Sequence, residues 1–241
     1  MKSFSALSEE IFDNSEEWQN VPSKVIIKMT HKNKQIKEFR TCALVIMRLE
    51  LFKAAVMRWQ TQSKDTGGIP VVQLELIPQT NCPAMVAVIR SIFTEHVRID
   101  SNTELDELLC MLYAADFIGQ VDAVAQVCEC LETRMTTDSV FKTLNAAHAL
   151  NREALVKAAI EYICENPAAL NSPSICDLDE NAMIKLLMSF NEDEQKVGVC
   201  DAVMFTIYQT WLYKRCNVEQ SHDVHQQLLA RFPLVNMPVE Y

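Results

Sequence analysis

The chain has 241 residues, of which 49% are hydrophobic and only 4 are glycine, and its formal net charge is −10. This composition favours a packed, helix-rich protein of one large or two small domains over a disordered chain. The acidic balance argues against general nucleic-acid binding, because phosphate contacts need clustered lysine and arginine. No apolar run approaches the roughly 18–20 residues that a membrane-spanning helix needs.

The 9 cysteines are an odd number, and they are spread over apolar helix faces rather than paired at loop positions. The N-terminus carries no signal-peptide pattern. We therefore interpret the cysteines as reduced thiols and expect a cytoplasmic protein, with the nucleus as the alternative compartment.

Residues 1–22 are acidic and partly amphipathic. Apolar side chains stand among the acidic ones at Leu7, Ile11, Phe12 and Trp18. Two interpretations remain open: a simple tail, or a helix that docks its apolar face on a partner.

Residues 25–29 and 35–39 predict two strands, with the turn between them at residues 30–34. The hairpin is basic, with Lys24, Lys28, Lys32, Lys34 and Lys37. A solvated strand face and a contact with an acidic partner both account for these lysines. No aromatic residues are interleaved with them for base stacking, so the pattern gives little support to nucleic-acid binding.

Residues 41–59 form a long apolar stretch, which we expect to be two helices. Its apolar positions are Leu44, Val45, Leu49, Phe52 and Val56. Residues 60–68 are polar and end in glycine, which predicts a surface loop. Residues 71–76 then predict a half-buried strand, because apolar and polar side chains alternate from Val72 onward.

Three amphipathic helices are predicted after this strand. Asn81 followed by Pro83 marks the start of the first, and Gly119 suits a left-handed C-cap at the end of the second. Their apolar stripes are Met85, Val88, Ile89 and Ile92, then Leu105, Leu108, Leu109 and Leu112, then Val121, Val124, Ala125, Cys128 and Leu131. Because a lone strand cannot bury itself, these helices must pack on it and on the strands of the hairpin.

The chain from Thr136 onward predicts helices throughout. A helix is expected through Leu150, and another from Asn151 to Glu165, before Pro167 and Pro173 break the pattern. Later helices are expected at 180–190, at about 194–215 with Trp211, and around 224–229.

Residues 71–135, with the stretch AADFIG at positions 114–119, resemble the second half of a BTB/POZ domain. That family shows a strand, a helix ending in an aromatic residue, a short strand, a leucine-rich helix and a final helix carrying cysteine. The later segments Asn191–Glu194, Trp211-Leu212 and 229–234 resemble the BACK domain that follows BTB domains in kelch-type adaptors. The resemblance implies an α+β protein: a BTB/POZ domain at 23–135, built as a small mixed sheet capped by helices, then an all-α BACK-like domain at 136–241. Residues 1–22 would be an acidic tail or a dimerisation helix.

The resemblance also implies partners and contact residues. BTB domains form homodimers, and the candidate interface residues are Leu7, Ile11, Phe12, Leu44 and Val45. In family members that bind cullin-3, a contact loop and a helix-end aromatic residue face the cullin. The matching candidates are Trp59, Phe93 and Glu95, although Phe93 could instead pack in the core. Gln60-Thr61-Gln62 stands where those members have an apolar residue, any residue and glutamate.

No motif for catalysis, cofactor binding or metal binding is expected to be functional. The four glycines form no phosphate loop, and no G-x-S-x-G elbow is present. Cys128 and Cys130 are two residues apart, so a helix points them in nearly opposite directions. His222 and His225 share a helix face but lack further ligands, and His148 reads as a partly buried helix residue.

We therefore expect a protein–protein interaction module that is not an enzyme. The first hypothesis is a dimeric substrate adaptor of a cullin-RING E3 ubiquitin ligase, holding a protein substrate that the sequence does not name. The alternative is a cullin-independent scaffold or structural subunit of a larger assembly, which the altered contact residues favour.

Overall fold

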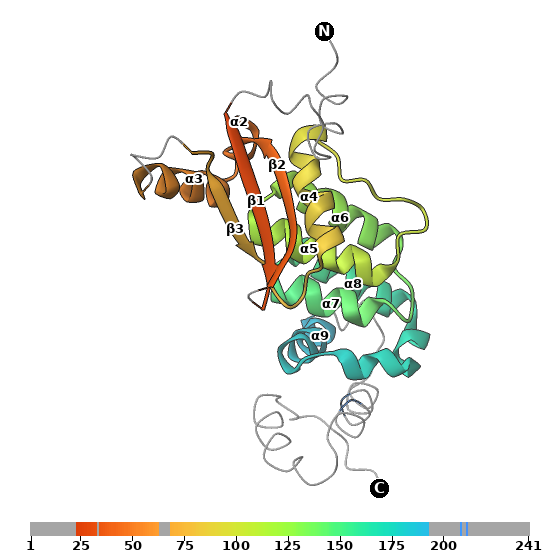
Figure 1. Cartoon of the computed structure of the whole chain (residues 1–241). Helices are drawn as coiled ribbons and strands as arrows, with labels where there is room; N and C mark the ends of the chain where they lie inside the picture. The colour runs from red at the N-terminus through yellow and green to blue at the C-terminus, as the bar shows by residue number, and fades with distance from the viewer. Residues whose placement is uncertain (1–22, 33, 63–67, 193–207, 209–210, 212–241) are drawn as a thin grey trace, which may run out of the picture. The chain divides into compact units, whose positions relative to one another are not determined.

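The computed structural model describes residues 23–32, 34–62 and 68–192, together with Tyr208 and Trp211 (Figure 1). Its contacts divide the chain into two units, Met1–Thr133 and Arg134–Tyr241. Residues 1–22, for which a tail and a docking helix are both open interpretations, lie outside the described residues. The expected helices beyond residue 192 also lie outside them, apart from those two aromatic residues.

A three-stranded mixed sheet opens the described part of the first unit. Its strands are β1 (Lys24–His31), β2 (Lys34–Cys42) and β3 (Val71–Glu75), in the order β2-β1-β3. Figure 1 shows β1 between its two neighbours; it runs antiparallel to β2 and parallel to β3. Val25, Ile27 and Met29 of β1 are fully buried, and the residues between them are partly exposed. This alternation gives the sheet one apolar face, and the three predicted strands are confirmed.

Two helices connect the hairpin to β3, as predicted: α2 (Ala43–Ile46) and α3 (Glu50–Gln62). The predicted loop at 60–68 is wrong in its first part, because α3 continues through Gln62. Glutamine is a good helix former, and the first glycine in this stretch comes only at position 67, so nothing in the local sequence stops the helix earlier.

Three helices follow β3: α4 (Cys82–Thr94), α5 (Leu105–Ile118) and α6 (Val121–Thr133). The Oδ1 atom of Asn81 accepts a hydrogen bond of 2.8 Å from the Ala84 N–H and caps α4, as predicted. Gly119 ends α5 with φ of 75°, the predicted left-handed cap. Residues 97–100, between α4 and α5, form no strand, although the family resemblance implies a short one there.

The core of the first unit lies between the apolar face of the sheet and these helices. Consecutive helices pack on each other, α4 on α5 and α5 on α6, and α3 packs on β3. Its largest fully buried side chains are Ile27, Met29, Ile46, Phe52, Met85, Ile89, Leu108, Leu112, Ile118 and Leu131. Burying each one stabilises the fold by about 1.5–3 kcal/mol. The described part of this unit is therefore α+β.

The described part of the second unit is helical. It contains α7 (Val140–Ala149), α8 (Glu153–Glu165), two 3₁₀ turns η2 (Pro167–Asn171) and η3 (Pro173–Asp177), and α9 (Glu180–Glu192). The helix predicted to start at Asn151 starts later, because Asn151 adopts a left-handed conformation with φ of 54°. Asparagine tolerates this conformation better than most residues do. Each proline opens a 3₁₀ turn where the sequence predicted a break.

Candidate protein-interaction surfaces

The two described candidates for a dimer interface are consecutive residues of the short helix α2, and they differ in exposure. Leu44 is 58% exposed, whereas Val45 is only 8% exposed and packs inside the unit. The difference arises because consecutive helical residues point about 100° apart. Leu44 therefore offers an apolar side chain to a partner, and Val45 does not. The other candidates, Leu7, Ile11 and Phe12, lie outside the described residues.

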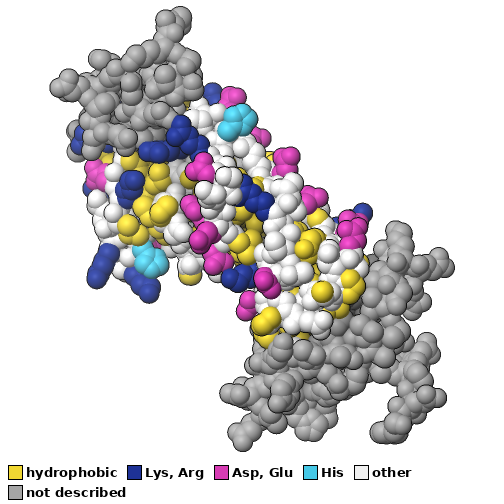
Figure 2. Space-filling model, turned by 90° about the vertical axis from the view of Figure 1, so that its right-hand side faces the viewer, with side chains coloured by type: hydrophobic (Ala, Val, Ile, Leu, Met, Phe, Trp, Pro, Cys, Tyr) yellow, Lys and Arg dark blue, Asp and Glu magenta, His cyan; other side chains and the backbone are white. Residues whose placement is uncertain are grey.

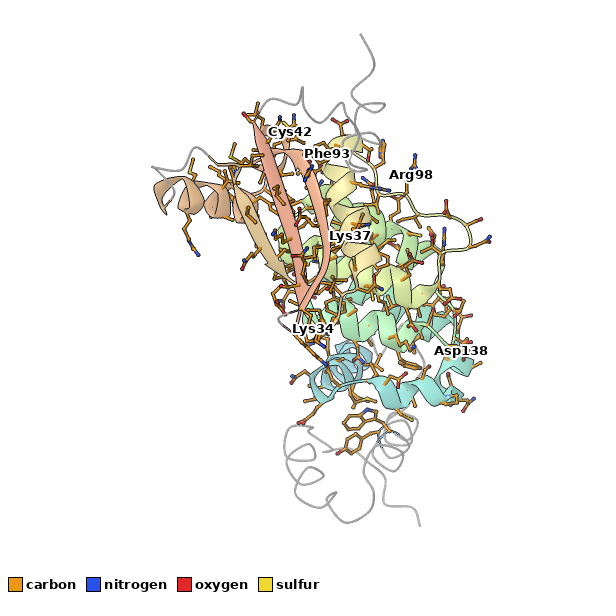
Figure 3. The ribbon with its side chains drawn as sticks, viewed as in Figure 1. Lys34, Lys37, Cys42, Phe93, Arg98 and Asp138 are labelled. Atoms are coloured by element: carbon orange, nitrogen blue, oxygen red, sulfur yellow. The ribbon has the colours of Figure 1, made fainter. Side chains whose placement is uncertain are left out.

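The candidates for a cullin contact fall on two helix ends. Trp59 lies in the last part of α3, and Phe93 lies in the last turn of α4. Phe93, which Figure 3 labels, is only 7% exposed, so the interpretation of this residue as core packing is favoured. Glu95 is exposed and ends α4 in a left-handed conformation with φ of 65°. Of the two candidates whose side chains are described, only Glu95 faces solvent.

The position of Glu95 is fixed by a side chain from α6. The Nε2 atom of Gln126 donates a hydrogen bond of 3.0 Å to the Glu95 carbonyl oxygen. The Oε1 atom of Gln126 accepts one of 2.9 Å from the Val97 N–H, so one amide holds both ends of a three-residue segment. This clamp satisfies backbone groups that no strand satisfies here. These contacts of Gln126 could not be predicted, since a single glutamine on a helix gives no sequence signal.

Replacing this glutamine should destabilise the first unit without reshaping it. We expect Gln126→Met to lower the free energy of unfolding by about 1–3 kcal/mol, because two backbone groups lose their partner. Urea denaturation followed by circular dichroism measures the change. Gln73→Met, at an exposed position of β3, is the matched control and should change stability by less than about 0.5 kcal/mol. Equal stabilities for the two variants would contradict the clamp.

Four further apolar side chains are exposed, and one of them, Val121, was wrongly predicted to belong to the apolar stripe of α6. They are Ile36 at 48%, Met57 at 53%, Ile69 at 36% and Val121 at 76%. A signal existed for Ile36, because it stands two residues from both Lys34 and Glu38 and so shares a strand face with charged residues. Single exposed apolar residues are normal, so only those with further support count as candidate contacts.

The side chains that could take part in metal or thiol chemistry are spread over the described residues. Within them, no group of three or more His, Cys, Asp or Glu side chains is placed to hold a metal ion. Cys128 and Cys130 are both free thiols. Burial, and then the charges of Asp106 and Glu107, raise the pKa of the Cys110 thiol. A raised pKa lowers the thiolate fraction at neutral pH and makes Cys110 a poor nucleophile. The pair His222 and His225 lies outside the described residues.

No helix in the described part of the chain combines the length and apolar character that crossing a membrane requires.

Comparison with known proteins assigns no family to the chain. The sequence matches no protein-family model, and no curated protein matches it.

Proposed function

We propose that this chain is a protein–protein interaction module with a BTB/POZ domain at 23–135 and a BACK-like helical domain at 136–241. In this proposal it acts in the cytoplasm as a dimeric substrate adaptor of a cullin-RING E3 ubiquitin ligase. The observation that supports the proposal most is the mixed sheet β2-β1-β3 followed by α4, α5 and α6. A small mixed sheet capped by helices is the arrangement that the sequence resemblance implies for the first domain.

The exposed Leu44 supports the dimeric part of the proposal. It is 58% exposed on a four-residue helix whose other side chains are all buried. A two-fold axis places the same residue twice in one interface, so each copy can cover the other. Covering a leucine side chain contributes at most about 1.5–3 kcal/mol per copy. The apolar residues Leu7, Ile11 and Phe12 would add to this interface if residues 1–22 dock as a helix.

The alternative, a cullin-independent scaffold or structural subunit, is favoured by two observations at the proposed cullin face. Phe93 is buried, so its ring gives a partner almost no surface. Gln60-Thr61-Gln62 belongs to α3 and carries glutamines where cullin-binding relatives have an apolar residue and glutamate. A scaffold would keep the dimer and use a different surface for its partners.

A binding titration separates the two functions. The full chain is titrated with the N-terminal domain of cullin-3 in a calorimeter, and the adaptor function predicts a dissociation constant at or below about 1 μM. Glu95→Lys should weaken this binding roughly tenfold, because it reverses an exposed charge on the proposed face. Glu132→Lys makes the same charge change at an exposed position of α6 and should leave the affinity unchanged. No heat of binding at about 100 μM would exclude the adaptor and leave the scaffold.

A further inference from the structure

The end of the β1–β2 hairpin carries a surface that the proposed function does not use. We call it the hairpin-end patch and define it as Lys32, Lys34, Ile36 and Lys37. All four residues are exposed, and Ile36 is 48% exposed. The whole run from Lys34 to Glu38 is exposed, so no described helix covers this part of β2. In the rest of β2, by contrast, Phe39, Thr41 and Cys42 are buried.

The pairing of β1 with β2 is irregular beside Ile36. Met29 pairs with Lys37 and Thr30 pairs with Gln35, so Ile36 is an extra residue without a partner on β1. An extra residue of this kind interrupts the ladder at the edge of a sheet. Ile36 is therefore an exposed apolar residue at an irregular position of the edge strand, and Lys34 and Lys37 flank it in the sequence.

A carboxylate from the neighbouring strand holds the hairpin end in place. Glu75 of β3 accepts a hydrogen bond of 2.8 Å from the Lys32 N–H through Oε1, and one from the Thr30 hydroxyl through Oε2. These bonds tie the end of β1 and the following Lys32 to the neighbouring strand β3. Two hydrogen bonds to one carboxylate therefore restrain Thr30 and Lys32, which lowers the conformational entropy that these two residues can lose on binding.

The patch is positively charged in an acidic protein. Between residues 24 and 42 the chain has six basic side chains and one acidic side chain, while the chain as a whole carries −10. The acidic one, Glu38, lies 3.4 Å from the Lys28 ammonium. The lysines of the patch form no ion pair with other described residues. Figure 3 labels Lys34 at the turn and Lys37 further along β2, and Figure 2 shows basic side chains projecting from the lower left edge of the coloured surface.

We propose that the hairpin-end patch binds an acidic segment of a partner protein in which one apolar residue stands between carboxylates. The carboxylates pair with the lysines and the apolar side chain covers Ile36. A large polyanion such as a membrane or a nucleic acid fits less well. Its parts that lie more than one Debye length, about 8–10 Å, from the lysines gain no attraction from them and come close to the acidic remainder of the chain instead. A short segment stays within the patch. The hairpin-end patch would bind this segment whether or not the first unit is a BTB domain.

Fluorescence anisotropy with a defined probe tests this. The probe is a fluorescein-labelled peptide of sequence Glu-Asp-Glu-Leu-Glu-Asp-Glu, and the protein is the full chain. The double variant Lys34→Glu/Lys37→Glu should bind it roughly tenfold more weakly, because two attractive pairs become repulsive. Lys53→Glu/Lys157→Glu makes the same change of net charge at a partly exposed position of α3 and an exposed position of α8, and should bind like the wild type. Ile36→Ser, or serine in place of the peptide's leucine, should weaken binding about fivefold.

Several results would overturn the proposal. The first is that the wild type does not bind the probe. The second is that the two double variants lose affinity for the probe equally. The third is that neither serine replacement changes the affinity. Tighter binding of phosphatidylserine vesicles or single-stranded DNA than of the peptide would assign the patch to a polyanion instead. A lower light-scattering mass for Lys34→Glu/Lys37→Glu would assign it to a second copy of the chain. Tighter peptide binding after removal of residues 1–22 would assign it to the chain's own acidic segment. Melting curves of all variants verify that each is folded.

Discussion

Leu44→Asp is expected to convert the protein from a dimer to a monomer while leaving each protomer folded. The side chain is 58% exposed in the single chain, so a carboxylate there remains hydrated until a second copy covers it. In a symmetric interface the substitution enters twice, and each copy buries a charge without a partner. The dissociation constant should rise about 100-fold or more. Light scattering over a dilution series measures the change.

Val121→Asp is the matched control for this experiment. Val121 is 76% exposed at the first position of α6, where an acidic side chain suits the helix N-terminus. The control should therefore remain dimeric with unchanged stability. A Leu44→Asp protein that keeps the wild-type mass would show that α2 lies outside any dimer interface.

Trp211→Ala is expected to lower the free energy of unfolding of the second unit by about 3–5 kcal/mol. Trp211 is 2% exposed, and its Nε1–H donates a hydrogen bond of 2.9 Å to the carbonyl oxygen of the buried Leu178. Its ring stacks on Tyr208, with centroids 6.2 Å apart. The substitution removes the apolar contacts and leaves the Leu178 carbonyl oxygen without this donor. Urea denaturation followed by far-ultraviolet circular dichroism measures the loss.

Trp211→Phe separates the two contributions of this side chain. It keeps an aromatic ring in the site and loses the hydrogen bond, so it should cost only about 1–3 kcal/mol. Equal losses for the two substitutions would mean that the hydrogen bond, rather than the buried ring, supplies most of the stabilisation. A loss below about 1 kcal/mol for Trp211→Ala would contradict the buried position of the residue.

The strands and the helix ends that carry specific chemistry were predictable from the sequence. The three strands follow from the alternation of apolar and polar residues, which reflects burial on one face of a sheet. The start of α4 follows from Asn81 and the end of α5 from Gly119, because each residue satisfies a local backbone requirement. Local chemistry decides these features, so one sequence suffices to find them.

The errors arise where local signals are weak or packing decides. In α6 the apolar stripe predicted Ala125 as buried, but Ala125 is exposed and Ala123 is buried. Both are alanines, so the rotation of the helix against α5 decides which one is covered. The helix boundaries at Gln62 and Asn151 differ for a related reason, since polar residues permit both helix and loop.

The candidate contact residues were only partly predictable for the same physical reason. Leu44 and Val45 are equally apolar, and a helix as short as α2 has no periodicity that could distinguish the exposed one from the buried one. An aromatic residue at the end of a helix suits both a core and an interface, and for Phe93 the core is observed. For Ile36, the charged residues on its strand face gave a signal, but the irregular pairing beside it depends on two strands and could not be predicted from the sequence.

The central claim is that this protein works by binding other protein chains, first of all a second copy of itself. The most direct test is the light-scattering mass of the purified full chain, measured with and without residues 1–20 over a range of concentrations. We predict twice the 27.4 kDa chain mass for the full chain and a weaker dimer for the truncated form. A mass of one chain at every concentration, with no effect of the truncation, would contradict the account.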